Sequence, residues 1–140
     1  MTDELWDVYA TAIIECVVDG ATRCLRGENA DALPAAAPIF VLTAYNPQGI
    51  ERASAQNEAA AARLERELTE AGLTFWPADG HSPDGSWSEP GVVIAGIGRA
   101  PACELGHRYG QLAVYELTGD EVLVVRCVDC EVVRARPRVT

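Results

Sequence analysis

Residues 39–57, IFVLTAYNPQGIERASAQN, place a buried strand, a polar loop and the start of a helix in immediate succession. The four apolar residues 39–42 run directly into turn-forming residues, which is typical of a strand buried on both faces. Pro47 cannot donate a ladder hydrogen bond and disfavours helical backbone at Asn46, so the strand is expected to end there. Polar side chains therefore gather at the carboxyl end of this strand, which is where ligands usually bind in open α/β sheets.

The most regular helical pattern follows this loop, over residues 55–71. Ser54 is a favoured N-cap residue, and Gly72 is a favoured residue just beyond a helix end. An apolar stripe at helical spacing consists of Ala60, Ala61, Leu64, Leu68 and Ala71. One turn further back, the stripe reaches Asn57, which is expected on the buried face beside the preceding strand. Asn57 then either belongs to a binding site or satisfies buried backbone groups of the loop at Asn46, and the sequence favours neither role.

The remaining strands are predicted from apolar segments bounded by turn residues. Hairpin turns at residues 19–20 and 119–120 each separate two such segments. Further strands are expected at residues 73–77 and 91–97. Between them lies ADGHSPDGSWSEPG, which is rich in turn residues and is expected to form a long irregular loop of the kind that often carries function.

These elements predict an α+β fold. A single domain is expected, in which two main helices, at residues 55–71 and 101–109, pack on a mixed, largely antiparallel β-sheet of about six to seven strands. Residues 3–10 fit a shorter helix. The domain is expected to span residues 1–130, and residues 131–140 are expected to form a basic C-terminal tail or an edge strand.

Composition limits the classes of partner. The 140-residue chain has a formal net charge of −10, and such an acidic surface repels phosphate groups, so neither nucleic acid nor an anionic membrane is expected as a partner. No apolar run approaches the roughly 18 residues of a membrane span, and the acidic amino terminus is unlike a signal peptide. We therefore expect a cytoplasmic protein, in which the five cysteines are mostly reduced thiols.

Five short motifs follow one another in the order TAYNP at 43–47, Ser54-x-x-Asn57, Gly80, Trp87-x-Glu89-Pro90 and Tyr109-Gly110-Gln111-x-Ala113. With these motifs the sequence resembles a bacterial family of small cytoplasmic proteins, domain of unknown function 3293, over nearly the whole chain. The segment LWDVYAT at residues 5–11 also fits the leader of that family. Gln56 departs from the family pattern, in which an acidic residue is usual at that position. The family brings no established activity, so the resemblance implies a shared folding unit and no particular reaction.

The candidate ligand-binding residues are hydrogen-bonding side chains near the predicted strand ends, namely Thr43, Asn46, Ser54, Asn57, Glu89 and Gln111. Such groups suit an amide, a hydroxyl or a base edge better than nucleophilic attack. Arg99 is a further candidate, because it follows a glycine-containing turn at a predicted helix start, where an anion is favoured. Pro101 replaces the third glycine of the dinucleotide fingerprint there. Glu89 is the candidate general base, and its simpler role is a loop acid that caps a backbone turn.

The cysteines allow one metal hypothesis. Cys103 and His107 lie four residues apart on a predicted helix, and Cys127-x-x-Cys130 has the spacing of a structural zinc site. Core thiols with a surface histidine are the favoured interpretation of the same residues, and no cofactor is predicted.

Three functional hypotheses follow. The leading one is a small-molecule-binding or interaction domain with a polar pocket at the TAYNP strand end, where the Asn57 helix start and Glu89 are expected to join Asn46 in one cluster. The second is an enzyme that acts on a nucleotide or another phosphorylated metabolite, with Arg99 as the anion site. The third is an acidic protein-binding module linked to stress or toxin control. A deep polar pocket would favour the first two, and a flat acidic face would favour the third.

Overall fold

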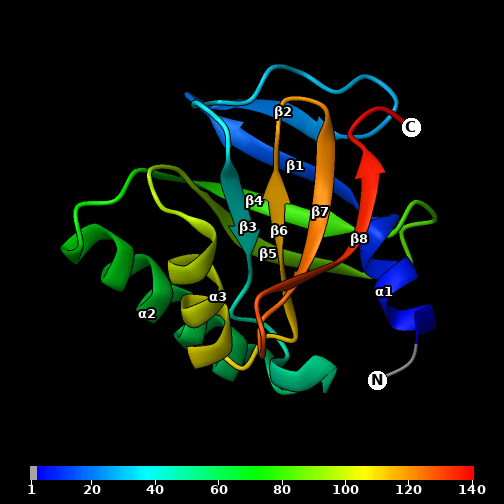
Figure 1. Cartoon of the computed structure of the whole chain (residues 1–140). Coiled ribbons are helices and arrows are strands. Elements are labelled where there is room, and N and C mark those ends of the chain that lie inside the picture. Colours follow the sequence, from blue (N-terminus) through cyan, green and yellow to red (C-terminus); the bar gives the residue numbers. More distant parts are fainter. Residues whose placement is uncertain (1–2) are drawn as a thin grey trace.

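A computed structural model describes residues 3–140 and has an α+β fold built on one curled eight-stranded sheet (Figure 1). In chain order, the elements are α1 (Asp3–Ala10), β1 (Ile13–Val18), β2 (Ala21–Arg26), β3 (Ile39–Leu42), a 3-10 turn (Pro47–Gly49), α2 (Ser54–Glu70), β4 (Phe75–His81), β5 (Ser88–Ile94), α3 (Arg99–Arg108), β6 (Ala113–Leu117), β7 (Glu121–Arg126) and β8 (Glu131–Pro137). The strand order in the sheet is β2-β1-β4-β5-β3-β6-β7-β8. Among these residues, no helix is both long and apolar enough to cross a membrane.

The sheet differs from the predicted one in two respects. All its paired strands are antiparallel, whereas a mixed sheet was expected. The one parallel contact in the described part of the chain is an isolated bridge between Gly27 and Val139. The sheet also has eight strands instead of six or seven, because β8 continues the β6–β7 hairpin by pairing along β7. With α1, the α-helices among residues 3–140 number three.

The segment expected to be an irregular loop forms most of a long hairpin. β4 and β5 pair from Phe75 opposite Ile94 to His81 opposite Ser88, which leaves only residues 82–87 for the turn. Side chains hold that turn: the Ser82 hydroxyl oxygen accepts the Trp87 backbone N–H at 3.1 Å, and the Asp84 carboxylate accepts the Ser86 N–H at 2.9 Å. Gly80, Pro90 and Gly91 are accommodated within the two strands, and only Pro83 and Gly85 lie in the turn, so the prediction of irregular structure was wrong for most of the segment.

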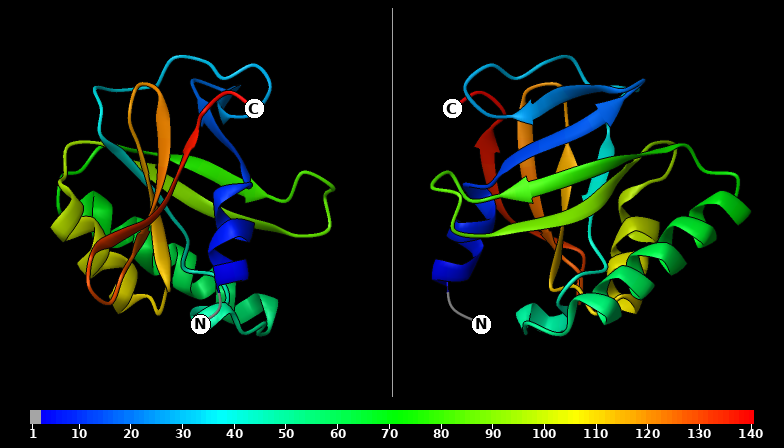
Figure 2. Two further views of the ribbon diagram at one scale, coloured as in Figure 1. Left: turned by 45° about the vertical axis from the view of Figure 1, so that its right-hand side comes forward. Right: turned by 180° about the vertical axis from the view of Figure 1, so that it is seen from behind.

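Helices α2 and α3 lie side by side on one face of the sheet, and α1 lies at the other end of the molecule (Figure 2). The predicted stripe on α2 is buried at Leu64 and Leu68, each 1% exposed, which share a core cluster with Phe40 and Leu42 of β3. Ala71 is exposed because the helix ends one residue before it.

Of the two capping residues predicted for α2, the one at the carboxyl end is confirmed and the one at the amino end is not. Gly72 has the positive φ, +71°, that favours glycine beyond a helix end. At the other end, Ala53 is the N-cap residue and Ser54 already lies in the first turn, and no side chain of the described residues caps that end. The prediction of Ser54 as N-cap was therefore wrong by one residue.

A second core fills the concave side of the curled sheet. All four residues of β3 are buried, as predicted for a strand covered on both faces. Because side chains alternate along a strand, Phe40 and Leu42 join the core under the helices, whereas Ile39 and Val41 join the inner core.

The curl brings the two edges of the sheet together. The Gly27 N–H donates to the Arg138 carbonyl oxygen at 2.9 Å, and the Thr140 N–H donates to the Gly27 carbonyl oxygen at 3.0 Å. Two buried arginines fasten this seam: Arg138 donates to the carbonyl oxygens of Gly119, Leu25 and Asp31, and Arg26 donates to those of Ala12 and Pro137.

Candidate functional site

Two asparagines join the carboxyl end of β3 to the start of α2. The Asn57 side-chain amide donates to the Asn46 side-chain oxygen at 2.9 Å, and the Asn57 oxygen accepts the Asn46 backbone N–H at 2.9 Å. Asn57 is 4% exposed, as expected from the extension of the apolar stripe. Asn46 adopts the left-handed region with φ +47°, which asparagine tolerates better than most residues. The two side chains that sequence placed at this junction therefore lie together.

Arg52 completes this network. Its guanidinium donates to the Asn57 side-chain oxygen at 2.7 Å and to the Ala44 carbonyl oxygen at 2.9 Å, and its backbone N–H donates to the Asn46 side-chain oxygen at 3.2 Å. Both asparagine oxygens thus already have donors within the protein. The geometry fits a brace for the loop between β3 and α2. The sequence signal for Arg52, a lone basic residue just before a helix start, was too weak to single it out.

The brace predicts a measurable contribution to stability. We expect Asn57→Ala to lower the free energy of unfolding by about 1–3 kcal/mol, because it leaves partly buried donors, including the Asn46 N–H, without an acceptor. Gln56→Ala, at an exposed neighbouring position of the same helix, is the matched control and should change stability by less than about 0.5 kcal/mol. Urea unfolding of both variants gives the comparison. If both variants changed the free energy of unfolding by the same small amount, the asparagine pair would contribute little to stability.

Thr43 and Gln111 connect the same strand end to two other parts of the chain. The Thr43 hydroxyl donates to the Pro90 carbonyl oxygen at 2.6 Å and accepts the Tyr45 N–H at 3.0 Å. The Gln111 side-chain amide donates to the carbonyl oxygens of Tyr45 and Tyr109 at 3.0 and 3.3 Å. These hydrogen bonds hold three parts of the chain together, namely the carboxyl ends of β3 and α3 and the amino-terminal half of β5.

A cavity of about 60 Å³ lies beside this junction. Its polar and aromatic lining consists of Tyr9, Thr43, Asn46, Asp79, Trp87, Glu89, Gln111 and Tyr115. The volume is far below the roughly 300–1,000 Å³ of a pocket for a drug-sized ligand, and it suits a few water molecules or the end group of a small ligand. Thr43, Asn46, Glu89 and Gln111 thus lie at one cavity, whereas Asn57, which was expected with them, is not among the described residues that line it.

Glu89 is the ionisable group that stands out in this cavity. On β5, the Ser88 hydroxyl bonds to Asp79 on one face of the hairpin, so the next side chain, Glu89, points to the opposite, inner face. Within residues 3–140, neither a hydrogen bond nor an ion pair reaches the half-buried Glu89 carboxylate. Burial raises the pKa of Glu89 because the ionised form loses solvation.

Two tyrosines accompany this carboxylate. Burial, with a further contribution from the negative charge of Glu89, raises the pKa of Tyr9 to about 12. Burial, together with Tyr9 and Glu89, also raises the pKa of Tyr115. The Tyr115 hydroxyl donates to the Tyr9 carbonyl oxygen at 2.8 Å and so ties α1 to the cavity wall. Tyr115 could have been found from sequence, because it follows Gln111 and Ala113 at the two-residue spacing of one strand face.

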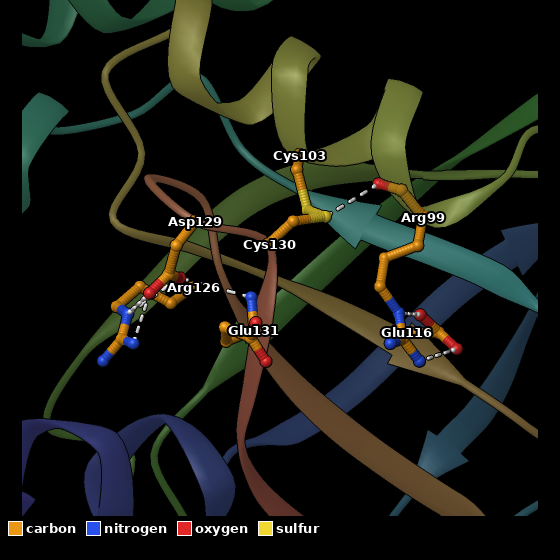
Figure 3. Close-up of a disulfide and its surroundings, with 7 residues drawn as sticks. All are labelled: Arg99, Cys103, Glu116, Arg126, Asp129, Cys130 and Glu131. Carbon is orange, nitrogen blue, oxygen red and sulfur yellow. Dashed lines mark hydrogen bonds and ion pairs between the residues drawn. A yellow bond between two sulfur atoms is a disulfide. The ribbon is translucent and has the colours of Figure 1, made fainter.

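Ser54 and Arg99 are not brought to the cavity. Ser54 is exposed in the first turn of α2. Arg99 begins α3, and its guanidinium binds both carboxylate oxygens of Glu116 at 2.7 and 3.1 Å (Figure 3). Glu116 is 6% exposed, so this arginine balances a buried charge. Neither residue is among those that line the cavity in the described chain.

One disulfide joins two of the five cysteines and the other three are free thiols, so most of the cysteines are reduced as expected, whereas the expectation of core thiols was wrong for the bonded pair. Cys103 of α3 and Cys130 of the β7–β8 turn are bonded across 27 residues of sequence, with their Cα atoms 5.8 Å apart (Figure 3). Two members of the hypothetical zinc set therefore bind each other. Of the other two, Cys127 is a buried thiol whose pKa burial raises to about 11, and His107 is exposed. The pairing depends on how α3 packs against the turn, which residue spacing does not reveal.

A family comparison agrees with the family that the sequence resembles. The family model described as "Protein of unknown function (DUF3293)" matches residues 42–114, just over half of the chain. The matched segment contains all five motifs and most of the cavity lining, whereas the leader at residues 5–11 lies outside it. No curated protein and no solved structure matches the chain. The chain belongs to the DUF3293 family of proteins of unknown function.

Proposed function

We propose that the protein binds a small molecule in the cavity at the carboxyl end of β3, and that the Glu89 carboxylate recognises a positively charged or hydrogen-donating group of that ligand. The observation that carries this proposal is the lack of an ion-pair or hydrogen-bond partner for Glu89 among residues 3–140. Burying part of a carboxylate without such a partner costs free energy. A ligand that supplies the missing donor would offset this cost.

The aromatic lining supports a cationic end group in particular. Tyr9, Trp87 and Tyr115 surround the same space as Glu89. A cation held near aromatic faces gains attraction from the ring quadrupoles, and a carboxylate adds a direct charge. The small volume limits the enclosed part to a group such as an ammonium or a guanidinium, while the rest of the ligand would extend outward.

The alternative of an enzyme that acts on a nucleotide or phosphorylated metabolite gains no support from the site. Arg99, the expected anion group, is engaged by Glu116. A cavity that contains Glu89 also repels phosphate. The alternative of an acidic protein-binding module rests on net charge alone.

The proposal is tested by NMR titration of the Trp87 indole N–H signal, assigned with Trp87→Phe. Methylguanidinium and methylammonium are the probes, acetamide is the neutral comparison, and methyl phosphate is the anionic one. We expect saturable shifts with the cations and none with methyl phosphate. Saturable binding of methyl phosphate alone, or no response to any probe, would contradict the proposed recognition.

Two variants connect binding to the cavity. Glu89→Gln should abolish the cation response, while Glu65→Gln, which removes the same charge from an exposed position of α2, should retain it. Gly80→Val should block the cavity. Gly80 lines it, and a Cβ there meets no atom of residues 3–140 within 4 Å, so the added side chain would occupy the cavity space.

A raised carboxyl pKa means that ionisation of Glu89 opposes folding, so stability falls as pH rises through its pKa. Glu89→Gln should therefore melt at the same or a higher temperature at neutral pH, which separates lost binding from lost folding.

A further inference from the structure

A second cluster lies on the opposite face of the β4–β5 hairpin from Glu89. Glu15 of β1 stands directly opposite Asp79 of β4, and His81 follows Asp79 on the same face. All three side chains are half-buried. Like charges directly opposite each other on neighbouring strands repel, so the Glu15–Asp79 pair gains from a cation placed between the two carboxylates.

The ligand atoms of this cluster converge. His81 Nδ1 lies 2.9 Å from an Asp79 carboxylate oxygen and 3.8 Å from a Glu15 carboxylate oxygen. Atoms that bind one zinc-like ion at about 2.0–2.2 Å lie about 3–4 Å from one another. All three atoms lie within 4.8 Å of each other, so small rotations of these half-buried side chains suffice to place them around one ion.

The surroundings hold these groups in position. The Ser88 hydroxyl donates to the second oxygen of Asp79 at 2.7 Å, as partners of metal-binding carboxylates commonly do. Glu15, Asp79 and His81 all project from paired strands, so their spacing is set by the backbone register.

We propose that Glu15, Asp79 and His81 bind one divalent transition-metal ion of the zinc class. One imidazole and two carboxylates favour such ions over Mg²⁺ and Ca²⁺, which prefer oxygen ligands alone. Three protein ligands leave a coordination position for water, as in open zinc sites. Asp79 also borders the Glu89 cavity, but this site lies on the opposite face of the hairpin from the Glu89 side chain and does not depend on the proposed ligand-binding function.

The test is calorimetric titration of the chelator-treated full chain with ZnCl₂ and, separately, with MgCl₂. We expect one zinc per chain and no saturable magnesium binding. Glu15→Gln, Asp79→Asn and His81→Ala should each weaken zinc affinity at least tenfold, with far-UV circular dichroism confirming that the variants fold. His107→Ala, which removes the other histidine from an exposed helix position, is the matched control and should bind zinc as the unmodified protein does.

Cobalt distinguishes this site from zinc held by the remaining thiols. Co²⁺ bound to nitrogen and oxygen should lack the intense sulfur-to-cobalt charge-transfer absorption that thiolate ligands produce. No saturable zinc binding would overturn the proposal and leave His81 as a hydrogen-bond partner of Asp79 only. Zinc affinity unchanged in His81→Ala, or thiolate absorption with Co²⁺, would overturn it as well, because the ion would then lie elsewhere.

Discussion

Leu68→Ala is expected to lower the free energy of unfolding by about 2–5 kcal/mol, the range for truncating a buried leucine. Leu68 is 1% exposed and lies on the face of α2 that packs against Phe40 and Leu42 of β3. Its loss removes apolar contacts and leaves a cavity between helix and sheet, which the paired strands cannot collapse to fill. Denaturant unfolding of the variant and the unmodified protein, analysed with one common m-value, measures the change in the free energy of unfolding.

The matched control for Leu68→Ala is Arg66→Ala on the exposed side of the same helix. Both changes introduce alanine into α2, so helix propensity favours neither variant by much. Arg66→Ala should alter stability by less than about 0.5 kcal/mol. If both variants lowered the free energy of unfolding by the same amount, the described packing of Leu68 against β3 would be contradicted.

Gly91→Ala is expected to destabilise the protein by about 3 kcal/mol or more, at or above the upper end for overpacking. A Cβ at Gly91 would meet the Leu42 backbone carbonyl oxygen well inside van der Waals contact. A backbone atom cannot rotate away as a side chain can, so β3 and β5 would have to separate where they pair beside the cavity. Thermal and urea unfolding measure the loss.

Gly80→Ala provides the contrast within the same hairpin. A Cβ at Gly80 meets no atom within 4 Å, and alanine in a strand costs less backbone entropy than glycine. Its stability should therefore equal or exceed that of the unmodified protein. A large loss in Gly80→Ala, or none in Gly91→Ala, would contradict the close approach of β5 to the end of β3.

Local sequence patterns predicted the elements whose buried face follows from the spacing of their own apolar residues. The apolar run at residues 39–42 and the stripe through Leu64 and Leu68 required only strand and helix periodicity. Asn57 was placed inward by the same periodicity, and its contact with Asn46 followed from the helix packing back on its own strand.

Features that depend on distant parts of the chain were not predictable in this way. The β4–β5 hairpin contains residues with low strand propensity, and pairing with β1 and β3 overrides that propensity. The disulfide joins residues far apart in sequence, and Tyr9 reaches the cavity only because α1 docks beside β6 and β7. Both require the tertiary arrangement, which periodicity does not contain.

The seam between β2 and β8 has a consequence for self-association. An open antiparallel sheet ends in rows of free N–H and C=O groups, to which another chain can add a strand. Here backbone bonds at Gly27 and the Arg138 guanidinium occupy part of both edges. Arg134 and Arg136 also project from β8, where both bind the Asp7 carboxylate of α1. Edge-to-edge growth into aggregates is therefore disfavoured, because an added strand would have to displace these bonds and approach charged side chains.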